Sequence, residues 1–292
     1  MCLKEVEVEE EYREWFEKAG ITVRKGALVR AVYGRDRDIL KALRQEERPV
    51  LGVAPPGVDV KLAATDLKML PALKNCVKIR VPRLTAENTY GRVYAVNEVA
   101  LLASAPGVFV KYSIYVDGEH LYNDMGDGVL VATPLGSTAY AMSAGGPKIK
   151  LEAPVVEIVP VNSALRRPPY VLPLNSTVEI VDAKSVEELM VIGDGVEKAR
   201  YVSPTQIYVD SFATLILSLK KAARSTEGLP PSALLVKRLL EERGPLTVEE
   251  VVRLSGLKPR TARHALQRLR ELNMVQAAID PTNPRRKLYH LT

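Results

Sequence analysis

Short strand-like segments fill the middle of the chain, from Val77 to Ile216, and this run constrains the fold most strongly. Segments such as RVYAVNEVALL, GVFVKYSIYVDGEHL, GVLVAT and TVEIVDA are apolar or alternating, and turn residues separate them. Many short strands with turn signals between them are typical of a sandwich-like β domain. The sequence therefore predicts a β-rich domain over residues 77–222.

An α/β pattern precedes this run, in residues 1–76. Strands are expected at Ala27–Tyr33 and Pro49–Val53, because both segments are short and apolar. Helices are expected at Val6–Ala19, Asp38–Gln45 and Ala63–Asn75, and Ser211–Ala223 is expected to close the body as an amphipathic helix. The predicted fold class of the body is therefore α/β followed by a β-rich domain.

A separate basic module is predicted at the end of the chain. The stretch AARSTEGLPPS is polar and rich in small residues, so residues 223–231 are predicted to be a linker and residues 232–292 a further domain. The formal net charge is +6, and all of this excess falls in residues 230–292. A basic module on a neutral body suggests an acidic polymer as partner, and a solubilising tail is the simpler alternative.

Three helices and a hairpin are predicted within residues 232–292. Ser232–Arg243 carries leucines on one face, and the Thr-Val-Glu-Glu box at 247–250 caps a second helix that buries Val251, Val252 and Leu254 and ends at Gly256. Pro259 opens a third helix. Its predicted buried stripe comprises Ala262, Ala265, Leu266, Leu269 and Leu272. Strands at Val275–Ile279 and Lys287–Leu291 can then pair across a Pro-rich turn.

This order resembles the α+β winged helix-turn-helix family, which implies double-stranded DNA as a partner. In that family the third helix enters the major groove. The implied base contacts come from Arg260, Thr261 and His264, contacts to bases or phosphates from Arg263 and Gln267, and contacts at the wing tip from Arg285, Arg286 and Lys287. A winged helix that serves only assembly is the alternative.

Composition excludes several other classes of protein. There is no apolar run of 18 or more residues, so no membrane span is expected. Two cysteines and three scattered histidines give neither a disulfide framework nor a metal-ligand spacing, so we expect a cytoplasmic chain with no metal site. Abundant Arg, Glu, Lys and Val with little Gln favour a thermophile.

The stretch VATPLGSTAYAMSAGGP at 131–147 has the character of a ligand loop. Gly136, Gly145 and Gly146 permit close approach or positive φ, and Ser137, Thr138 and Ser143 offer hydroxyls that suit a base edge or a ribose. Tyr140 offers a face for stacking. Asp127 can accept from an exocyclic amine, and Glu98 can chelate ribose hydroxyls.

Three segments together resemble the NAD kinase family: AVNEVALL, DGVLVATPLGSTAYAMSAGGP and PVVEIVPVNSALRRPPYVLP. The resemblance implies a two-domain body, α/β then β-rich, with NAD or NADP bound between the domains. It implies that Asn97 and Glu98 hold ribose and diphosphate. It places Asp127, Thr138, Ala139, Tyr140 and Ser143 around the adenine and nicotinamide ends.

The chain departs from the family where phosphate transfer occurs. The family carries Gly-Gly-Asp-Gly there, and this chain reads Gly34-Arg-Asp-Arg37, so that Asp36 matches the expected base while arginines replace two glycines. A β-carbon at a position that needs positive φ would cost about 1 kcal/mol. Ala54-Pro-Pro-Gly-Val58 replaces a Gly-rich turn, Leu135 replaces a small hydroxyl residue, and the family's first strand is not found because the chain is expected to begin at a helix.

These departures favour an NAD(P)-sensing, DNA-binding transcription regulator built on a catalytically impaired pseudo-kinase body. The alternative is an active NAD kinase with a regulatory winged-helix module, in which Asp36 is the catalytic base and ATP and Mg²⁺ are required. A third possibility is a nucleotide-binding protein whose winged helix mediates assembly. The resemblances also imply a homodimer or tetramer.

Overall fold

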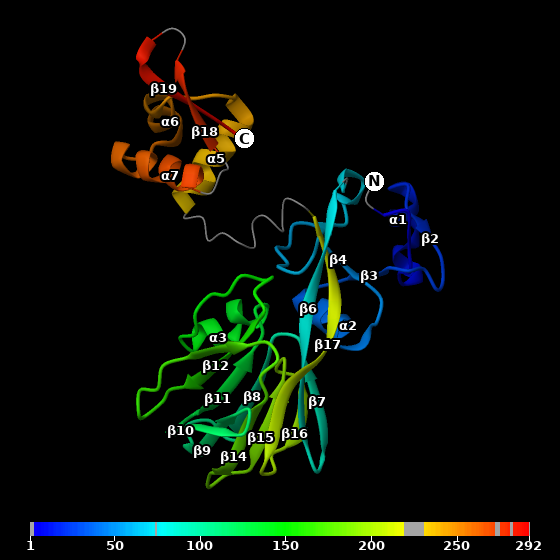
Figure 1. The fold of residues 1–292 in the computed structure, drawn as a ribbon. Helices are drawn as coiled ribbons and strands as arrows, with labels where there is room; N and C mark the ends of the chain where they lie inside the picture. Colours follow the sequence, from blue (N-terminus) through cyan, green and yellow to red (C-terminus); the bar gives the residue numbers. More distant parts are fainter. Residues whose placement is uncertain (1–2, 74, 219–230, 272–274, 281–282, 292) are drawn as a thin grey trace. The chain divides into compact units, whose positions relative to one another are not determined.

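The protein forms two compact units, Met1–Thr226 and Glu227–Thr292, each described here by itself. The structure is a computed structural model that describes residues 3–73, 75–218, 231–271, 275–280 and 283–291 (Figure 1). The predicted linker at 223–231 lies almost entirely outside these residues. Within the described ranges, no helix is long and apolar enough to cross a membrane.

The chain begins with a small strand pair rather than with the predicted helix. Strand β1 (Glu5–Val6) runs parallel to β2 (Thr22–Val23), and between them lie η1 (Glu10–Tyr12) and α1 (Arg13–Lys18). The helix predicted for Val6–Ala19 is therefore wrong over its first half. The stretch Glu5-Val-Glu-Val8 alternates, so an extended chain buries Val6 and Val8 and leaves the glutamates to pair with arginines.

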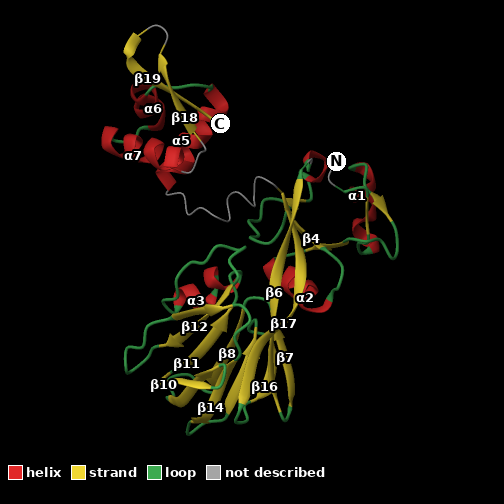
Figure 2. Cartoon of the chain, viewed as in Figure 1, coloured by secondary structure: helices red, strands yellow, loops and turns green. Residues whose placement is uncertain are grey.

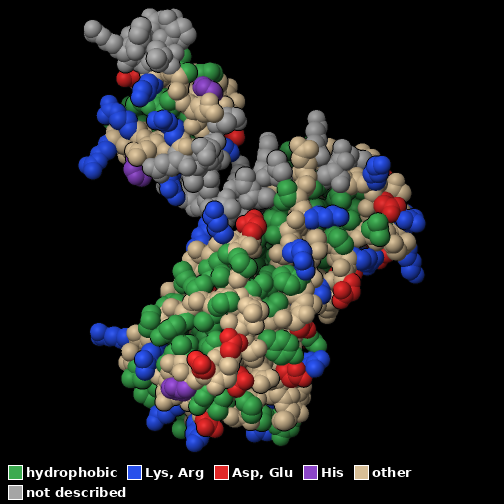
Figure 3. Space-filling model, viewed as in Figure 1, with side chains coloured by type: hydrophobic (Ala, Val, Ile, Leu, Met, Phe, Trp, Pro, Cys, Tyr) green, Lys and Arg blue, Asp and Glu red, His purple; other side chains and the backbone are tan. Residues whose placement is uncertain are grey.

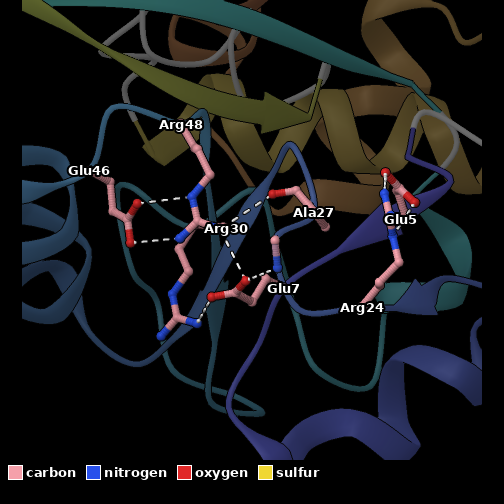
Figure 4. A network of polar contacts seen from close by, with 8 residues as sticks. Glu5, Glu7, Arg24, Ala27, Arg30, Glu46 and Arg48 are labelled. Atoms are coloured by element: carbon pink, nitrogen blue, oxygen red, sulfur yellow. Dashed lines mark hydrogen bonds and ion pairs between the residues drawn. The ribbon is translucent and has the colours of Figure 1, made fainter.

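Ion pairs hold this N-terminal segment to the first parallel strands (Figure 4). Glu7 lies 3.5 Å from Arg30 and 3.2 Å from Arg48, and Arg48 also lies 3.1 Å from Glu46. Its Nη1 donates to the carbonyl of Ala27 at 3.3 Å. A hydrogen bond from the Gly26 amide, followed by the pairs with Arg48 and Arg30, lowers the pKa of Glu7.

The α/β part contains a helix, α2 (Asp36–Gln45), whose N-terminus belongs to the candidate site. Strand β3 (Arg30–Tyr33) leads into α2 (Asp36–Gln45), and β4 (Val50–Ala54) runs parallel to β3 with every residue buried. The helix predicted at Ala63–Asn75 is wrong. Strand β5 (Thr65–Asp66) pairs with β4, and among the described residues of this segment only the single turn η2 (Leu70–Ala72), which contains Pro71, is helical.

Two sheets form the rest of the body (Figure 2). The nine-stranded sheet has the order β10-β9-β14-β17-β4-β3, with β5, β6 and β7 paired off this path. Its remaining strands are β6 (Cys76–Asn88), β7 (Gly91–Ala95), β9 (Val110–Val116), β10 (Glu119–Gly126), β14 (Val178–Lys184) and β17 (Thr205–Ser218). The amphipathic helix predicted from Ser211 is wrong over 211–218, because this segment pairs with both β6 and β4. Residues 219–223 lie outside the described ranges.

The six-stranded sheet is entirely antiparallel, in the order β13-β12-β11-β8-β15-β16. Its strands are β8 (Glu98–Ala103), β11 (Gly128–Ala132), β12 (Val155–Val161), β13 (Tyr170–Pro173), β15 (Leu189–Gly193) and β16 (Glu197–Arg200). One core joins Ile114 and Val178 of the first sheet with Val129 and Ile158 of the second. The predicted sandwich-like packing is thereby confirmed. On the opposite face of the second sheet, Ala141 packs against Ala132 and Val159.

Cys76 is disulfide-bonded, which departs from the expectation that the chain has no disulfide framework. The residue begins β6 and pairs with Ser218 at the end of β17.

The second unit contains three helices and a hairpin in the predicted order. These are α5 (Pro231–Arg243), α6 (Val248–Ser255), α7 (Pro259–Glu271), β18 (Val275–Asp280) and β19 (Asn283–Leu291). The capping box of Thr247 and Glu250 is present, and Gly256 caps α6 with φ 69°. Leu235 and Leu254 are partly exposed instead of buried, because Val236 and Val251 take the core positions.

The stripe predicted for α7 is buried at its first four positions, Ala262, Ala265, Leu266 and Leu269. Leu272 lies outside the described residues. The strands β18 and β19 are longer than expected, since Asp280 already pairs with Asn283. The predicted Pro-rich turn at 280–286 is therefore largely strand.

Candidate dinucleotide and phosphoryl-transfer site

Thr133 fixes the loop that follows β11. Its hydroxyl donates to the carbonyl of Val96 at 2.6 Å and accepts from the amides of Leu135 and Gly136 at 3.1 and 3.2 Å. Gly136 must lack a side chain, because a Cβ there would lie 2.1 Å from the Asn97 carbonyl oxygen. The start of the motif is therefore held against the Asn97–Glu98 turn by backbone contact.

The hydroxyl groups of this loop differ in their burial and in the hydrogen bonds that they form within the protein. Ser137 is fully buried, and its Oγ donates to the Pro134 carbonyl at 2.8 Å and accepts from the Ile149 amide at 3.0 Å. Its hydroxyl therefore stabilises the loop, contrary to the expectation that it faces a ligand. The half-buried Thr138 donates to the Leu135 carbonyl at 3.3 Å, and Ser143 is exposed at the end of α3 (Tyr140–Ser143).

Asp194 organises the turn that carries Asn97 and Glu98. Its Oδ1 accepts from the amides of Asn97 and Val96 at 2.7 and 3.0 Å, and its Oδ2 lies 2.6 Å from Arg44 Nη1. Both charged side chains are almost completely buried. This pair was not predicted from the sequence, in which its one signal is the Gly-Asp-Gly turn after β15, where Asp194 adopts φ 48°.

Glu98 is a buried acid with one free oxygen. The residue is 7% exposed, and its Oε2 has no hydrogen-bond partner within the described part of the chain. Burial, followed by the nearby charge of Asp194, raises the pKa of Glu98 to about 7. A carboxyl group that is partly protonated near neutrality can both donate to and accept from hydroxyl groups.

Tyr140 lies within electrostatic range of both Asp127 and Glu98. Tyr140 is 39% exposed, and burial together with the charges of Asp127 and Glu98 raises its pKa. Asp127 accepts a hydrogen bond from Asn162 at 2.6 Å. The structure thus brings together Asn97, Glu98, Thr138, Ala139 and Tyr140, with Asp127 and Ser143 at the edges. Their roles as ligand contacts stay predictions.

Asp36 is linked to this loop through Lys61. Oδ1 of Asp36 accepts from the Leu62 amide at 2.8 Å, and Oδ2 accepts from the Lys61 amide at 3.2 Å. The Nζ of Lys61 donates to the carbonyl of Thr138 at 3.2 Å. The N-terminus of α2 and the motif loop, which are far apart in sequence, are therefore joined by one short bridge.

The strain predicted for the Gly34–Arg37 segment is absent. Arg35 has φ −96° and ψ 176°, and Arg37 lies within the first turn of α2. Neither is among the described non-glycine residues with positive φ. Gly34 keeps the one constrained position, with φ 154° and Asp38 Oδ2 2.5 Å from where a Cβ would lie. Both arginines point into solvent and leave the backbone unstrained.

A hollow at another place in the body contains none of these residues. It has a volume of about 580 Å³ and is lined mainly by β6, residues 151–154 and Phe212 of β17. None of the predicted site residues borders it. Convergent polar groups, which fix a ligand's orientation, lie instead around Asp36, the Asn97–Glu98 turn and the Thr138 loop.

Acidic, histidine and cysteine side chains form no group of three suited to a metal ion within the described ranges.

Five of the eight residues predicted to touch DNA lie on α7. Arg260, Arg263, His264 and Gln267 are exposed, and Thr261 is half-buried. On the face of unit 2 in view in Figure 3, Lys and Arg side chains gather. Lys287 is exposed on β19, whereas the side chains of Arg285 and Arg286 lie outside what the structure describes.

Comparisons with known proteins find similarity to NAD kinases over part of the body. Residues 96–211 match the family model of the ATP-NAD kinase C-terminal domain. The chain is 41% identical over 104 residues to an NAD kinase of Methanopyrus kandleri, which covers 35% of this chain and 37% of that one. It is 31% identical over 175 residues to an NAD kinase of Methanocorpusculum labreanum, covering 56% and 63%. The matches thus span less than two thirds of these relatives.

Solved structures extend the likeness to the whole body. An NAD kinase from Archaeoglobus fulgidus in complex with ATP superposes with a TM-score of 0.62 at 21% identity, covering 76% of this chain and 99% of that one. Yeast NADH kinase complexed with NADH gives a TM-score of 0.60 at 19% identity, covering 78% and 88%. At this level of identity the likeness shows the fold.

These findings correct the predicted function. The prediction of a transcription regulator on a catalytically impaired body is wrong, because the relatives are named as NAD kinases and the structural neighbours as NAD and NADH kinases. They favour the alternative, an NAD kinase. Residues 96–211 thus correspond to the C-terminal domain of the ATP-NAD kinases, and the body of this chain has the NAD kinase fold.

Proposed function

We propose that this protein is an NAD kinase that transfers the terminal phosphoryl group of ATP to the 2′-hydroxyl of NAD. The observation that carries the proposal is the bridge from Asp36 through Lys61 to Thr138. It supports a single site in which the carboxylate of the first part lies beside the loop expected to hold the dinucleotide. The unstrained Gly34–Arg37 segment supports it further.

In this proposal Asp36 is the catalytic base. Each of its oxygens accepts one backbone hydrogen bond, which orients the carboxylate and leaves a further lone pair on each oxygen. It removes the proton of the 2′-hydroxyl as that oxygen bonds to the γ-phosphorus, while the bond to the β-phosphate oxygen breaks and ADP leaves. Glu98 and Asn97 would hold the ribose, and Tyr140 would stack on a base.

Arg35 and Arg37 would contribute to binding the phosphates of ATP. Both are exposed at the N-terminus of α2, where backbone amides and the helix dipole also favour anions. Mg²⁺ fits this arrangement as part of the ATP complex, since it keeps phosphate and water ligands and needs only one or two protein carboxylates. When bound, it would neutralise charge on the transferred group.

The test is formation of NADP from NAD, ATP and Mg²⁺ by the full chain. Asp36→Asn should lower turnover by about 10²–10⁴-fold, the usual contribution of a general base. Asp59→Asn, which changes an exposed carboxylate three residues before Leu62, is the matched control and should leave turnover unchanged. Equal turnover of wild type and Asp36→Asn would remove Asp36 from the mechanism.

We further infer that unit 2 is a winged-helix module whose α7 face binds double-stranded DNA, and that the chain is a homodimer or tetramer. The first inference concerns a partner only and assigns no regulatory activity. It is supported by the exposed Arg260 and Arg263 on the side of α7 opposite its buried stripe.

Fluorescence anisotropy with a labelled duplex tests this inference. Arg260→Ala with Arg263→Ala should weaken binding and lower the salt dependence by about one unit of slope per lost phosphate contact. The control, Arg238→Ala, removes an exposed arginine of α5 that pairs with Glu242 at 3.0 Å. Unit 2 is not a DNA-binding module if wild type and the double variant bind alike or not at all.

A further inference from the structure

Glu157 is a buried carboxyl group without a partner, next to the proposed dinucleotide site. It lies in β12, is fully buried, and neither of its oxygens has a hydrogen-bond partner within the described part of the chain. Glu157 pairs with Ala132 of β11 from one side, and Glu98 pairs with the same residue from the other. Directly opposed residues point to the same face, so both glutamates lie on the face covered by Ala141 of α3.

The turn that ends α3 closes over this carboxyl group. A Cβ on Gly146 would lie 3.0 Å from Glu157 Oε2 and 2.9 Å from the carbonyl oxygen of Ala141. The amides of Ala144 and Gly146 donate to the carbonyls of Tyr140 and Ala141 at 3.0 and 2.8 Å. The same short helix carries Tyr140 and Ser143, so any movement of this turn moves residues expected to contact the dinucleotide.

No charged group compensates Glu157. Glu98 shares its face of the sheet, α3 contributes the phenol of Tyr140, and the segment after the turn carries Lys148 and Lys150. Within the described ranges none of these forms a hydrogen bond or ion pair with Glu157. Burial alone raises the pKa of Glu157 to about 7. A neutral carboxylic acid is tolerated in such surroundings far better than a carboxylate.

We propose that Glu157 is a positioning residue for the dinucleotide site, closing the Ala144–Gly146 turn when neutral and opening it when ionised. An ionised Glu157 needs water or a donor, and the turn is the cover whose opening admits them. Opening displaces Tyr140 and Ser143 and weakens dinucleotide binding. The link to the dinucleotide rests on the proposed function, whereas the opening of the turn does not.

Hydrogen exchange in the full chain without substrates tests the opening. The probes are the amides of Ala144 and Gly146, compared at each pH between wild type and Glu157→Gln. For each amide, the protection factor of wild type divided by that of Glu157→Gln should fall by up to about tenfold per pH unit from pH 5 to about pH 7. It should then level off, because opening releases one proton in that range. The comparison at equal pH cancels the intrinsic pH dependence of exchange and the contribution of Glu98.

Two further variants make the result specific. Glu157→Met should behave as Glu157→Gln does, so that the test survives if one variant folds poorly. Glu152→Gln, at an exposed glutamate before β12, should retain the wild-type profile. A protection ratio independent of pH overturns the proposal.

Affinity for NAD supplies the second readout. The Kd of wild type should rise about tenfold from pH 6 to pH 8 relative to that of Glu157→Gln. A turn that opens with pH while this relative Kd stays constant overturns the positioning role. If the turn opens with pH but the chain binds no NAD, the opening of the turn by Glu157 is supported and the proposed kinase function is overturned. The two failures are therefore distinguishable.

Discussion

At the scale of single residues, acids rather than hydroxyls dominate the site. The motif was predicted to bind a ligand from its glycines and hydroxyls, yet the hydroxyls of Ser137 and Thr133 hydrogen-bond to the backbone and hold the loop. Glu98 was identified from its position at the end of a strand run. The burial of Glu98 beside Asp194 could not be predicted, because the contact joins residues that are 96 positions apart in the sequence. Local sequence predicts the chemistry of a residue better than it predicts which residues surround it in the fold.

Glu98 should make the stability of the protein depend on pH. Its pKa is raised from 4.5 to about 7 in the folded protein, so the folded state holds the proton more tightly than the unfolded state. The contribution of Glu98 to the free energy of unfolding should therefore be fully present below pH 4.5 and be lost as the pH rises to about 7, a change of up to about 3 kcal/mol.

Chemical denaturation at pH 5 and pH 8 measures this difference. Glu98→Gln should reduce the fall between the two pH values, since glutamine does not titrate. Exposed Glu152→Gln provides the control and should leave the fall unchanged. An identical fall in wild type and Glu98→Gln would show that the carboxyl group titrates normally.

At the scale of elements, α2 and the β15–β16 turn are coupled by the ion pair of Arg44 and Asp194. Arg44 stands near the end of the helix that begins with Asp36, and Asp194 holds the amides of the Asn97–Glu98 turn. The pair thereby fixes the helix carrying the proposed base relative to the proposed ribose contacts. Its partners are 150 residues apart, which explains why no local pattern revealed it.

Arg44→Met should destabilise the protein by about 3–5 kcal/mol, because it leaves the Asp194 carboxylate buried without its counter-charge. Arg200→Met is the matched control. Arg200 pairs with Glu188 at 3.1 Å on the surface, so its loss should cost at most about 1 kcal/mol. Denaturant unfolding of both variants measures the contrast, and similar losses would mean that the buried pair contributes no more than a surface one.

Element prediction succeeded where periodicity was clear and failed where pairing overrode it. The strands at 30–33 and 50–54, the capping box at Thr247 and the stripe of α7 followed the sequence pattern. Segments 63–75 and 211–218 read as helices because their apolar residues also fit a helical stripe. Pairing of the second with β6 over the full length of β17 made it a strand. Such tertiary pairing is invisible to local propensity.

At the scale of the whole molecule, the sequence predicted the fold of the body correctly but predicted its activity wrongly. The long motif at 131–147 predicted the fold, which the structural neighbours confirm. The Gly34–Arg37 segment suggested lost activity through backbone strain, and the structure shows an unstrained backbone there. The residue substitutions were correctly noticed, but their cost depended on φ angles that the sequence does not give.

Formation of NADP tests the central claim most directly. The full chain, supplied with NAD, ATP and Mg²⁺, should produce NADP and ADP in equal amounts, with Asp36→Asn at about 1% of wild type or less and Asp59→Asn at the wild-type rate. Production should also stop when either NAD or ATP is omitted. A wild-type chain that binds NAD and ATP yet forms no NADP would contradict the account.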